Sequence, residues 1–241
     1  MTIKALLLAA GFGTRLRPLT NTTPKCLVPF GTKPILQLWL EKLEKINCRS
    51  ALINTHYLSE KVHSFVDSYS SNSQMNINIS YEPTLLGTAG TLLSNLDFFD
   101  GSLSLLIHAD NFMYESLSPA IAQHKQSSSL LTMVTFTTNS PQSCGIVKID
   151  SGGVVQSFHE KVSNPPGNIA NGAIYIFDKR FVDFLRSNFS GLPSIVDFSA
   201  EIIPLIVGQI RVWHTKKMFA DIGTLESYQL AQDFYTRNGI E

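Results

Sequence analysis

Residues 7–30 read Leu-Leu-Ala-Ala-Gly-Phe-Gly-Thr-Arg-Leu-Arg-Pro-Leu-Thr-Asn-Thr-Thr-Pro-Lys-Cys-Leu-Val-Pro-Phe. The mainly apolar run that leads into them, residues 3–10, is short enough to form a buried strand and stops at Gly11. Gly11 and Gly13 let backbone N–H groups approach an anion closely, because glycine has no Cβ. Arg15 and Lys25 add the fixed positive charge that phosphate oxygens require. The segment therefore predicts a strand followed by a loop that binds a polyphosphate.

Two other glycine-rich loops match this segment poorly. A dinucleotide-binding fingerprint needs glycine where Leu16 stands and an acidic residue at the end of the second strand, which instead ends at His56. A Walker loop needs Gly-Lys-Ser/Thr ahead of a helix, and the segment has no such triplet. A glycine turn with solvated arginines is the ordinary alternative, but glycines, arginines and a Pro-Lys pair occurring together favour phosphate binding.

The runs Gly-Phe-Gly-Thr-Arg-Leu-Arg-Pro-Leu-Thr and Pro-Lys-Cys-Leu-Val-Pro resemble the signature of the sugar-1-phosphate nucleotidyltransferases. Further motifs extend this resemblance over nearly the whole chain, and they are most similar to those of mannose-1-phosphate guanylyltransferase-like members. The resemblance implies an enzyme that joins a nucleoside triphosphate, GTP or UTP, to a sugar 1-phosphate with Mg²⁺ and releases pyrophosphate. Such enzymes make nucleotide sugars, for example for cell-surface polysaccharides.

Composition disfavours several other classes of protein. The 241 residues include 19 basic and 19 acidic side chains, so the net charge is zero, which argues against a general nucleic-acid binder. The three cysteines show neither a disulfide framework nor a CxxC metal site, which suits a reducing cytoplasm. The N-terminal apolar run lacks a basic segment before it, and no stretch approaches the roughly 20 apolar residues of a membrane span. We therefore expect a cytoplasmic protein without a signal peptide and without a membrane partner.

Strand and helix patterns alternate along the chain. Short apolar or alternating runs predict further strands at 51–54, 76–81, 103–108, 130–136, 171–177 and 210–214. Helical spacing predicts a helix that opens at residues 31–34, with Pro34 in its first turn, and extends to Ile46. Further helices are predicted after a Ser59 cap, at 92–98, at 197–207 and after a Thr224 cap, the last with Leu225, Tyr228 and Leu230 buried. This alternation predicts a mostly parallel sheet with helices on both faces.

Together with the resemblance, the alternation implies a Rossmann-like three-layer α/β/α fold with a mixed, mostly parallel central sheet, of the nucleotide-diphospho-sugar transferase type. We expect one domain over residues 1–241, in which 1–110 mainly bind the nucleotide and 111–241 mainly bind the sugar phosphate. The chain has no hexapeptide repeats, so no appended C-terminal β-helix is expected.

Residues 82–90, Glu-Pro-Thr-Leu-Leu-Gly-Thr-Ala-Gly, lead into a predicted helix. Gly87 and Gly90 permit close backbone approach and leave space for a flat base, although a plain helix-entry turn has the same pattern. In the family the matching segment lines the pocket for the base and sugar of the nucleotide, and this version is similar to that of guanylyltransferases. The resemblance implies nucleotide contacts from Leu8, Ala10, Gly11, Gly13, Thr14, Arg15, Lys25, Glu82, Gly87, Thr88 and Ala89.

Two aspartates follow or end short apolar segments. Asp110 comes directly after the predicted strand at 103–108, and open α/β sheets bind ligands at the carboxyl ends of their strands. Asp221 lies in the run Phe-Ala-Asp-Ile-Gly-Thr. Capping of a turn is the ordinary role of such a residue, but the position favours Mg²⁺, which prefers hard oxygen ligands. The family's motifs usually have glycine and tryptophan where this chain has Ala109 and Phe219.

A predicted hairpin joins residues 144–150 to 154–158 and places Glu160 and Lys161 at the end of its second strand. Such a pair is usually a solvated surface pair. In the family, however, the matching lysine binds the phosphate of the sugar phosphate and the glutamate binds sugar hydroxyls. The resemblance implies sugar-phosphate contacts from Asn111, Gly145, Glu160, Lys161, Asn171 and Gly172.

The implied reaction is in-line attack by a sugar-1-phosphate oxygen on the α-phosphorus of the nucleotide. It needs no general base, because a phosphate monoester has a second pKa of about 6 and is mostly dianionic at neutral pH. Catalysis then consists of positioning and charge neutralisation. The implied assignments are Arg15 to the β- and γ-phosphates, Lys25 to the α-phosphate, Lys161 to the incoming phosphate, and Asp110 and Asp221 to Mg²⁺.

Alternatives remain within and beyond this family. A uridylyltransferase or a heptose-1-phosphate guanylyltransferase would carry the same motifs. A glycosyltransferase would also place a metal-binding carboxylate after a strand, but it would not need the Gly-Thr-Arg and Pro-Lys loop. A non-catalytic regulatory protein that binds a nucleotide sugar would not need Arg15, Lys25, Asp110 and Asp221 together. The sequence does not settle the base, the sugar or whether the chain forms a homo-oligomer.

Overall fold

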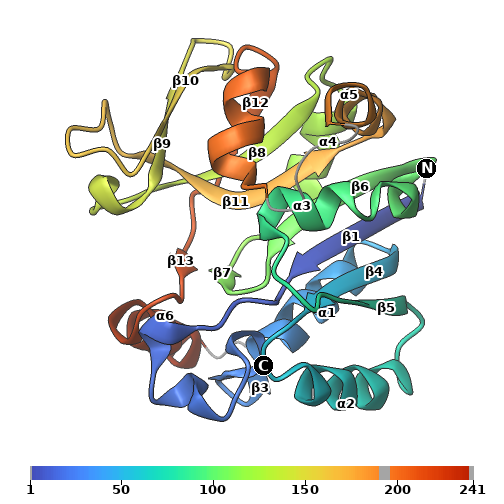
Figure 1. Ribbon diagram of the computed structural model, residues 1–241. Coiled ribbons are helices and arrows are strands. Elements are labelled where there is room, and N and C mark those ends of the chain that lie inside the picture. Colours follow the sequence, from blue (N-terminus) through green and yellow to red (C-terminus); the bar gives the residue numbers. More distant parts are fainter. Residues whose placement is uncertain (1, 190–195, 239–241) are drawn as a thin grey trace. The chain divides into compact units, whose positions relative to one another are not determined.

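The computed structural model describes residues 2–189 and 196–238 of the chain. These residues form two compact units whose segments alternate along the sequence. Unit 1 contains Leu86–Leu106 and Leu117–Lys216, and unit 2 contains Ile3–Leu85, Ile107–Ser116 and Lys217–Glu241. Each unit combines strands with helices (Figure 1).

The sheet of unit 2 consists of three parallel strands, β1 (Thr2–Leu8), β4 (Cys48–Thr55) and β5 (Asn76–Tyr81). Apolar residues fill the middle of β1 and β4 and are buried, as expected for parallel strands that helices cover. Helix α1 (Ile35–Lys45) packs against β4, and α2 (Ser59–Ser70) packs against β5. Because the strands are parallel, their carboxyl ends lie at one edge of this sheet (Figure 1).

The other elements of unit 2 are short and follow these strand ends. They are three one-turn 3₁₀ helices at Thr14–Leu16, Leu19–Asn21 and Lys25–Leu27, the antiparallel pairs β2 (Pro29–Phe30) with β3 (Lys33–Pro34) and β7 (Asn111–Met113) with β13 (Phe219–Asp221), and α6 (Leu225–Arg237). Thr224 caps α6 as predicted. Its hydroxyl accepts a hydrogen bond from the Ser227 N–H, and the Ser227 hydroxyl accepts one from the Thr224 N–H, which together form a capping box.

Unit 1 contains a mixed set of strands. They are β6 (Ser102–His108), whose last two residues belong to unit 2, β8 (Leu131–Thr137), β9 (Gly145–Ile149), β10 (Val155–Glu160), β11 (Ile169–Phe177) and β12 (Ile210–His214). Strand β8 is antiparallel to β11 and parallel to β12, and β9 and β10 form the predicted hairpin. The helices are α3 (Gly87–Leu93), α4 (Ser118–Lys125) and α5 (Lys179–Phe189). The predicted α/β class with a mixed sheet is confirmed.

Several local predictions were wrong. The helix predicted to open at residues 31–34 begins only at Ile35, because Lys33 and Pro34 pair with β2 as β3. The helix predicted at 92–98 is not continuous, because α3 ends at Leu93 and Leu96–Phe99 is a separate 3₁₀ turn. Ser59 is the first residue of α2 rather than its cap, and the N-cap is Leu58, with φ of 51°. Residues 197–207 do not form an α-helix. They form a π-helical turn, Phe198–Ile202, and a 3₁₀ turn, Ile203–Ile206, in which Pro204 has no N–H to donate.

A further error concerns the buried face of α6. Leu225 and Leu230 were predicted to be buried, but their side chains are 45% and 60% exposed. The helix instead buries Ala231 and Tyr235. Within residues 2–189 and 196–238, no helix is both long enough and apolar enough to cross a membrane.

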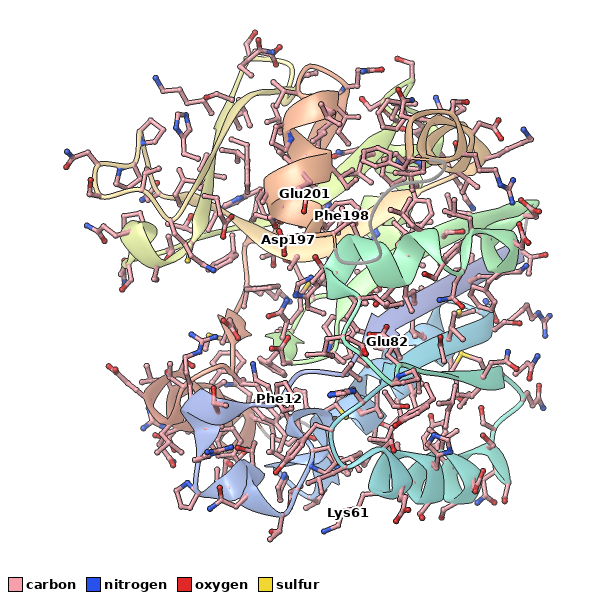
Figure 2. The ribbon with its side chains drawn as sticks, in the orientation of Figure 1. Phe12, Lys61, Glu82, Asp197, Phe198 and Glu201 are labelled. Atoms are coloured by element: carbon pink, nitrogen blue, oxygen red, sulfur yellow. The ribbon has the colours of Figure 1, made fainter. Side chains whose placement is uncertain are left out.

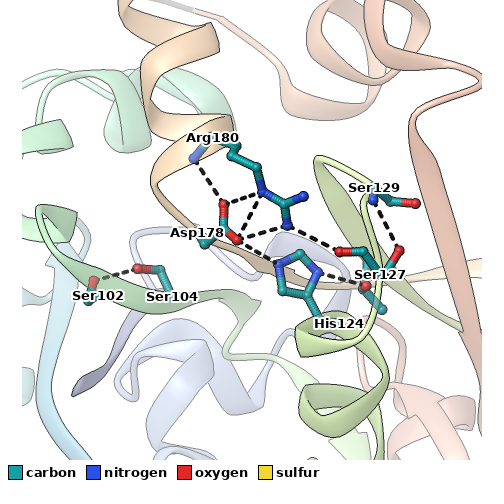
Figure 3. Close-up of polar contacts among 8 residues, drawn as sticks. Ser102, Ser104, His124, Ser127, Ser129, Asp178 and Arg180 are labelled. Atoms are coloured by element: carbon teal, nitrogen blue, oxygen red, sulfur yellow. Dashed lines mark hydrogen bonds and ion pairs between the residues drawn. The ribbon is translucent and has the colours of Figure 1, made fainter. Parts of the chain in front are cut away.

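A fully buried histidine holds part of unit 1 together (Figure 3). His124 of α4 places its Nδ1 2.9 Å from the Thr132 hydroxyl and its Nε2 3.8 Å from a carboxylate oxygen of Asp178. Arg180 donates hydrogen bonds to that carboxylate and to the backbone oxygen of Ser127. Burial lowers the pKa of His124 to about 4, and the charge of Asp178 opposes this shift only in part. The imidazole is therefore neutral in the folded protein near pH 7.

Candidate functional site

The predicted phosphate loop follows β1, and its shape depends on Gly13. This residue has φ of 63°, which glycine adopts without strain. A Cβ at this position would lie 2.8 Å from Cγ2 of Thr20 and 3.1 Å from Cβ of Lys25. The Thr20 hydroxyl donates a 2.7 Å hydrogen bond to the Gly13 carbonyl oxygen, so the loop is fastened at its turn. The N–H groups of Thr14 and Arg15 begin a one-turn helix and have no acceptor within it.

Lys25 connects this loop to both predicted metal-binding aspartates. Its side chain is only 10% exposed, its ammonium forms an ion pair with the carboxylate of Asp110, and its Nζ lies 3.8 Å from Oδ1 of Asp221. The Arg15 guanidinium reaches the same place. It and the Asp221 carboxylate both lie next to Gly223, because a Cβ added to Gly223 would lie 2.9 Å from each of them. Two cationic and two anionic side chains thus converge within unit 2.

Backbone pairing brings the two aspartates together although they are far apart in the sequence. In the antiparallel pair of β7 and β13, Asn111 lies opposite Asp221. The Ile222 N–H donates a 3.1 Å hydrogen bond to the Asp110 carbonyl oxygen. The Ala109 N–H donates a 3.0 Å hydrogen bond to the carbonyl oxygen of Leu8, the last residue of β1. Regular hydrogen bonds therefore fix both carboxylates beside the end of β1.

The two carboxyl groups differ in their acidity. Burial acts to raise the pKa of Asp110, but the positive charges of Lys25 and His108 and the hydrogen bond from Lys25 outweigh it and hold this pKa below its ordinary value. Burial, followed by the negative charge of Asp110, raises the pKa of Asp221, and Lys25 and Arg15 oppose this only in part. The pair therefore retains repulsion that a further cation would relieve.

This donor set suits Mg²⁺. Both residues offer hard carboxylate oxygens at one place, and Mg²⁺ usually takes only one or two protein carboxylates beside water and substrate phosphates. No group of three or more His, Cys, Asp and Glu side chains arranged for a metal ion occurs in the described part of the chain. The arrangement thus fits an ion that is shared with a phosphate substrate, rather than a closed structural metal site.

Glu82, a predicted nucleotide contact of unit 2, follows β5 and is buried (Figure 2). Its Oε1 accepts a 2.9 Å hydrogen bond from the side-chain amide of Asn54. Its own N–H donates to the carbonyl oxygen of Thr55 at 2.8 Å, and its carbonyl oxygen lies 2.7 Å from Nδ1 of His56. The structure therefore places the Glu82 carboxylate in the interior of unit 2, where it orients its neighbours.

The remaining predicted nucleotide contacts, Gly87, Thr88 and Ala89, belong to unit 1 and form the first turn of α3. Gly87 has φ of 78°, and a Cβ there would lie 2.5 Å from the Val196 carbonyl oxygen. That oxygen accepts a hydrogen bond from the Ala89 N–H at 2.9 Å. The Thr88 hydroxyl accepts a hydrogen bond from the Phe198 N–H at 2.7 Å and donates one to the Asp197 carboxylate. These bonds attach the first turn of α3 to the segment that contains Asp197 and Phe198 (Figure 2).

The predicted sugar-phosphate contacts of unit 1 gather at the end of the hairpin. Gly145 lies opposite Glu160 in the pairing of β9 with β10. A Cβ on Gly145 would lie 2.5 Å from the Phe158 ring and 2.6 Å from Oε2 of Glu160, so only glycine leaves that carboxylate in place. Lys161 has φ of 48°, its N–H donates to the Cys144 carbonyl oxygen, and its Nζ lies 3.3 Å from Oε1 of Glu160.

Asn171 and Gly172 lie in an irregular part of β11. The register with β8 shifts between Asn171 and Tyr175, and Ala173 has φ of 50°. The Asn171 side chain accepts a hydrogen bond from the Ala173 N–H and donates one to the Tyr175 hydroxyl. Its amide therefore holds the bulge, which redirects the strand as bulges near ligand sites do.

The structure thus separates the predicted site residues into two groups. Unit 2 brings together Leu8, Ala10, Gly11, Gly13, Thr14, Arg15, Lys25, Glu82, Asp110, Asn111 and Asp221. Unit 1 contains Gly87, Thr88, Ala89, Gly145, Glu160, Lys161, Asn171 and Gly172. Asn111 is buried, and its carbonyl oxygen accepts a hydrogen bond from the Trp39 indole.

Sequence reasoning missed several residues that shape these groups. Asn54 forms hydrogen bonds with Glu82 and with the backbone that follows β1. Asp197 accepts a hydrogen bond from Thr88, and Gly223 leaves space for the Arg15 guanidinium. Gly223 was within the Phe-Ala-Asp-Ile-Gly-Thr motif and could have been singled out there. A lone asparagine at a strand end gives no comparable signal.

A model of the nucleotidyl transferase family matches residues 4–238, so the chain belongs to this family. A mannose-1-phosphate guanyltransferase of Schizosaccharomyces pombe is 30% identical over 94% of this chain and 62% of its own length. A UTP–glucose-1-phosphate uridylyltransferase of Synechocystis is 28% identical over 94% of this chain and 61% of its own. The chain therefore spans somewhat less than two thirds of the length of these curated relatives.

Solved structures share the fold at lower sequence identity. A putative glucose-1-phosphate thymidylyltransferase from Bacillus anthracis, solved with sucrose, has a TM-score of 0.87 at 22% identity and covers 97% of this chain and 95% of its own. HddC from Yersinia pseudotuberculosis, solved with GMP-PN, has a TM-score of 0.79 at 23% identity and covers 96% of this chain and 99% of its own. These likenesses confirm the predicted nucleotide-diphospho-sugar transferase type of fold.

Proposed function

We propose that this chain transfers a nucleotidyl group from a nucleoside triphosphate to a sugar 1-phosphate and releases pyrophosphate. One observation carries the proposal: Arg15, Lys25, Asp110 and Asp221 converge at the end of β1, next to a loop that only glycine can form at Gly13. Membership of the nucleotidyl transferase family supports it. A phosphoryl-transfer site needs cations for the phosphate oxygens and carboxylates for a divalent ion, and this cluster supplies both.

In the proposed reaction each cationic residue neutralises charge at one phosphate. Lys25 binds the α-phosphate, where the pentacovalent centre gains negative charge, and Arg15 binds the β- and γ-phosphates that leave as pyrophosphate. Lys161 binds the phosphate of the sugar 1-phosphate, whose oxygen attacks in line. No residue need remove a proton, because the attacking phosphate is mostly dianionic near pH 7, with a second pKa of about 6.

Asp110 and Asp221 are the residues that would hold Mg²⁺. When bound, the ion supplies positive charge that screens the phosphate oxygens of both reactants and orients them. The raised pKa of Asp221 supports this assignment, because the repulsion between the two carboxylates favours an additional cation. We infer that nucleotide contacts come mainly from residues 1–110, with Thr88 on α3, and sugar-phosphate contacts mainly from 111–241.

GTP with a manno-configured sugar 1-phosphate is the substrate pair that we propose first. Mannose-1-phosphate guanylyltransferases recur among the relatives, and HddC, which shares the fold, was solved with a guanine nucleotide analogue. UTP with glucose 1-phosphate is second, since the uridylyltransferase of Synechocystis is equally similar in sequence. A heptose 1-phosphate is a third acceptor. We further propose a cytoplasmic location and a product that serves cell-surface polysaccharide synthesis.

The experiment that tests the proposal measures pyrophosphate release with Mg²⁺ from a matrix of nucleoside triphosphates and sugar 1-phosphates. We expect one pair to turn over well above the others. Lys25→Met should lower this activity by roughly 10²- to 10³-fold, whereas Lys33→Met, which removes a cation paired with Glu41 in the same unit, should retain it.

A silent matrix would contradict the proposal. Calorimetric binding of a nucleotide sugar without turnover would then indicate a regulatory protein. Consumption of a nucleotide sugar, with transfer of its sugar to an acceptor, would indicate a glycosyltransferase.

A further inference from the structure

Asn54 occupies a special position among the parallel strands of unit 2. It lies on β4, opposite Leu8 of β1 on one side and Ser80 of β5 on the other. Leu8 is the last residue of β1, so Asn54 stands where the phosphate loop begins. Its side chain is almost completely buried, at 4% exposure.

The side-chain amide of Asn54 bonds two neighbouring segments at once. Its Oδ1 accepts a 2.6 Å hydrogen bond from the backbone N–H of Ala9, the first residue after β1. Its Nδ2 donates a 2.9 Å hydrogen bond to Oε1 of Glu82, the first residue after β5. Both contacts are buried, where a hydrogen bond is strengthened and a lost partner is costly.

Two further contacts join the same segments. The Glu82 N–H donates to the Thr55 carbonyl oxygen at 2.8 Å, and Nδ1 of His56 lies 2.7 Å from the Glu82 carbonyl oxygen. The His56 ring in turn meets the edge of Phe12, in the phosphate loop, with ring centroids 5.3 Å apart. The residues that follow Asn54 therefore contact both the Glu82 segment and the phosphate loop.

We propose that Asn54 is a positioning residue for nucleotide binding, which couples the start of the phosphate loop at Ala9 to the nucleotide segment at Glu82. This inference rests on the proposed function. The neutral amide accepts from the Ala9 N–H and also donates to the Glu82 carboxylate, whereas an ionised carboxylate in its place could only accept. Asn54 itself touches no substrate in this account. It fixes the direction in which the chain leaves β1 and so the placement of the loop N–H groups and of Arg15.

Replacement of Asn54 by aspartate tests the coupling through its pH dependence. In Asn54→Asp two carboxyl groups would face each other in a buried place, and such a pair holds one proton with a strongly raised pKa. When protonated, the introduced carboxyl group could again donate to Glu82 and accept from Ala9, so acid should restore the geometry. The imidazole of His56 is a titratable group that contacts the Glu82 backbone, and it is common to both proteins.

The measured quantity is kcat/KM for the nucleoside triphosphate in the variant, divided by that of the wild type, between about pH 8 and pH 6. We expect a loss of about tenfold or more at the alkaline end and a ratio that rises toward the acid end. The ratio cancels the titration of the phosphate substrates, which is the same for both proteins. Asn78→Asp is the matched control, because it adds the same charge at an exposed site on β5.

Asn54→Ala gives the second measurement. We expect its KM for the nucleoside triphosphate to rise about tenfold or more while its KM for the sugar 1-phosphate stays within about twofold. Thermal unfolding of each variant shows whether it is folded at the assay temperature. A flat pH ratio for Asn54→Asp, or an equal rise of both KM values in Asn54→Ala, would overturn the inference.

Failure of this inference differs from failure of the proposed function. If the wild type turns over no pair in the matrix, the function is wrong, and nucleotide affinity measured by calorimetry then tests Asn54 alone. In that case Asn54→Asp should still bind the nucleoside triphosphate more weakly than the wild type at pH 8 and recover affinity at pH 6. Equal affinity of the two proteins at both pH values would contradict the coupling.

Discussion

The two groups of candidate residues use lysine in opposite ways. Lys25 of unit 2 has a side chain that is 10% exposed and faces two carboxylates, whereas Lys161 of unit 1 has a side chain that is 66% exposed and faces one. The buried lysine works where solvent cannot screen its charge, so its position is set before substrate arrives. The exposed lysine is held by its ion pair with Glu160. The difference supports our proposal that Lys25 supplies fixed charge at the reacting phosphate and that Lys161 contacts the sugar phosphate.

The backbones around the two lysines differ as well. In unit 2, regular pairing of β7 with β13 places Asp110 beside Asp221. In unit 1, Lys161 and Ala173 both have positive φ, which is costly for residues with a Cβ and tends to occur at ligand sites. Regular pairing therefore fixes the charge cluster of unit 2, whereas the candidate residues of unit 1 lie in irregular backbone.

The largest effect is expected from loss of the buried lysine charge. Lys25→Met should lower kcat by roughly 10²- to 10³-fold, as removal of one preorganised charge contact does in other enzymes. The KM values should change much less. Steady-state pyrophosphate release measures this, with Lys33→Met as the control. A normal kcat in Lys25→Met would show that Lys25 takes no part in the chemical step and that the proposed difference between Lys25 and Lys161 is wrong.

A smaller effect is expected from crowding Glu160, one of the unit 1 residues that we propose to contact the sugar phosphate. Gly145→Ala places a methyl group 2.6 Å from Oε2 of Glu160 and should raise the KM for the sugar 1-phosphate about tenfold, with little change in the KM for the nucleotide. Gly167→Ala is the control, because a Cβ there meets no atom within 4 Å. If Gly145→Ala changed only the nucleotide KM, the assignment of this group to the sugar phosphate would be wrong.

Loosening the first turn of α3 should have a smaller effect on the kinetic constants. Thr88→Val keeps the shape of the side chain but removes the acceptor for the Phe198 N–H and the donor to Asp197. We expect the KM for the nucleoside triphosphate to rise about fivefold, corresponding to about 1 kcal/mol. Thr88→Ser retains the hydroxyl and should behave like the wild type. Equal kinetics of the valine and serine variants would show that this hydroxyl does not position the nucleotide segment.

The smallest expected effect concerns stability alone and arises from His124. Its pKa in the folded protein, about 4, lies below the value of about 6.5 in an unfolded chain, so only the unfolded chain gains a proton as pH first falls below neutral. The free energy of unfolding should therefore drop by about 1 kcal/mol between pH 7 and pH 5.5 through this residue. The stability is present above pH 6.5 and is lost as pH falls toward 4.

Urea unfolding of His124→Asn measures this contribution. The variant should lose about 1 kcal/mol less than the wild type over the same pH interval. Replacement of the exposed His63 on α2 by asparagine should leave the pH dependence of the wild type unchanged. An identical pH dependence in His124→Asn and the wild type would show that the imidazole is not held neutral by burial.

Much of the fold followed from local patterns. The alternation of apolar runs and helical spacing predicted β1, β4 and β5, because each is a short apolar or alternating segment bounded by polar residues. The error on α6 also has a physical reason. Apolar residues at helical spacing indicate one face, but α6 buries the smaller Ala231 and the aromatic Tyr235 and leaves Leu230 exposed.

The candidate site was predictable only in part. Residues 7–30 carry their glycines and cations within one segment, so local sequence suffices to indicate phosphate binding. The convergence of Lys25 with Asp110 and Asp221 depends on strand pairing between distant segments, which no short motif reports. Asn54 was missed because its role lies in two buried hydrogen bonds to residues 45 and 28 positions away.

The most direct test of the account compares pyrophosphate release by the wild type and Asp221→Asn over a series of Mg²⁺ concentrations, with the productive substrate pair. We expect the variant to turn over at least about 10²-fold more slowly at limiting Mg²⁺ and to regain at most part of this loss at high Mg²⁺, because one proposed carboxylate ligand is gone. Normal turnover of Asp221→Asn at limiting Mg²⁺ would contradict the assignment of the unit 2 charge cluster as the catalytic centre.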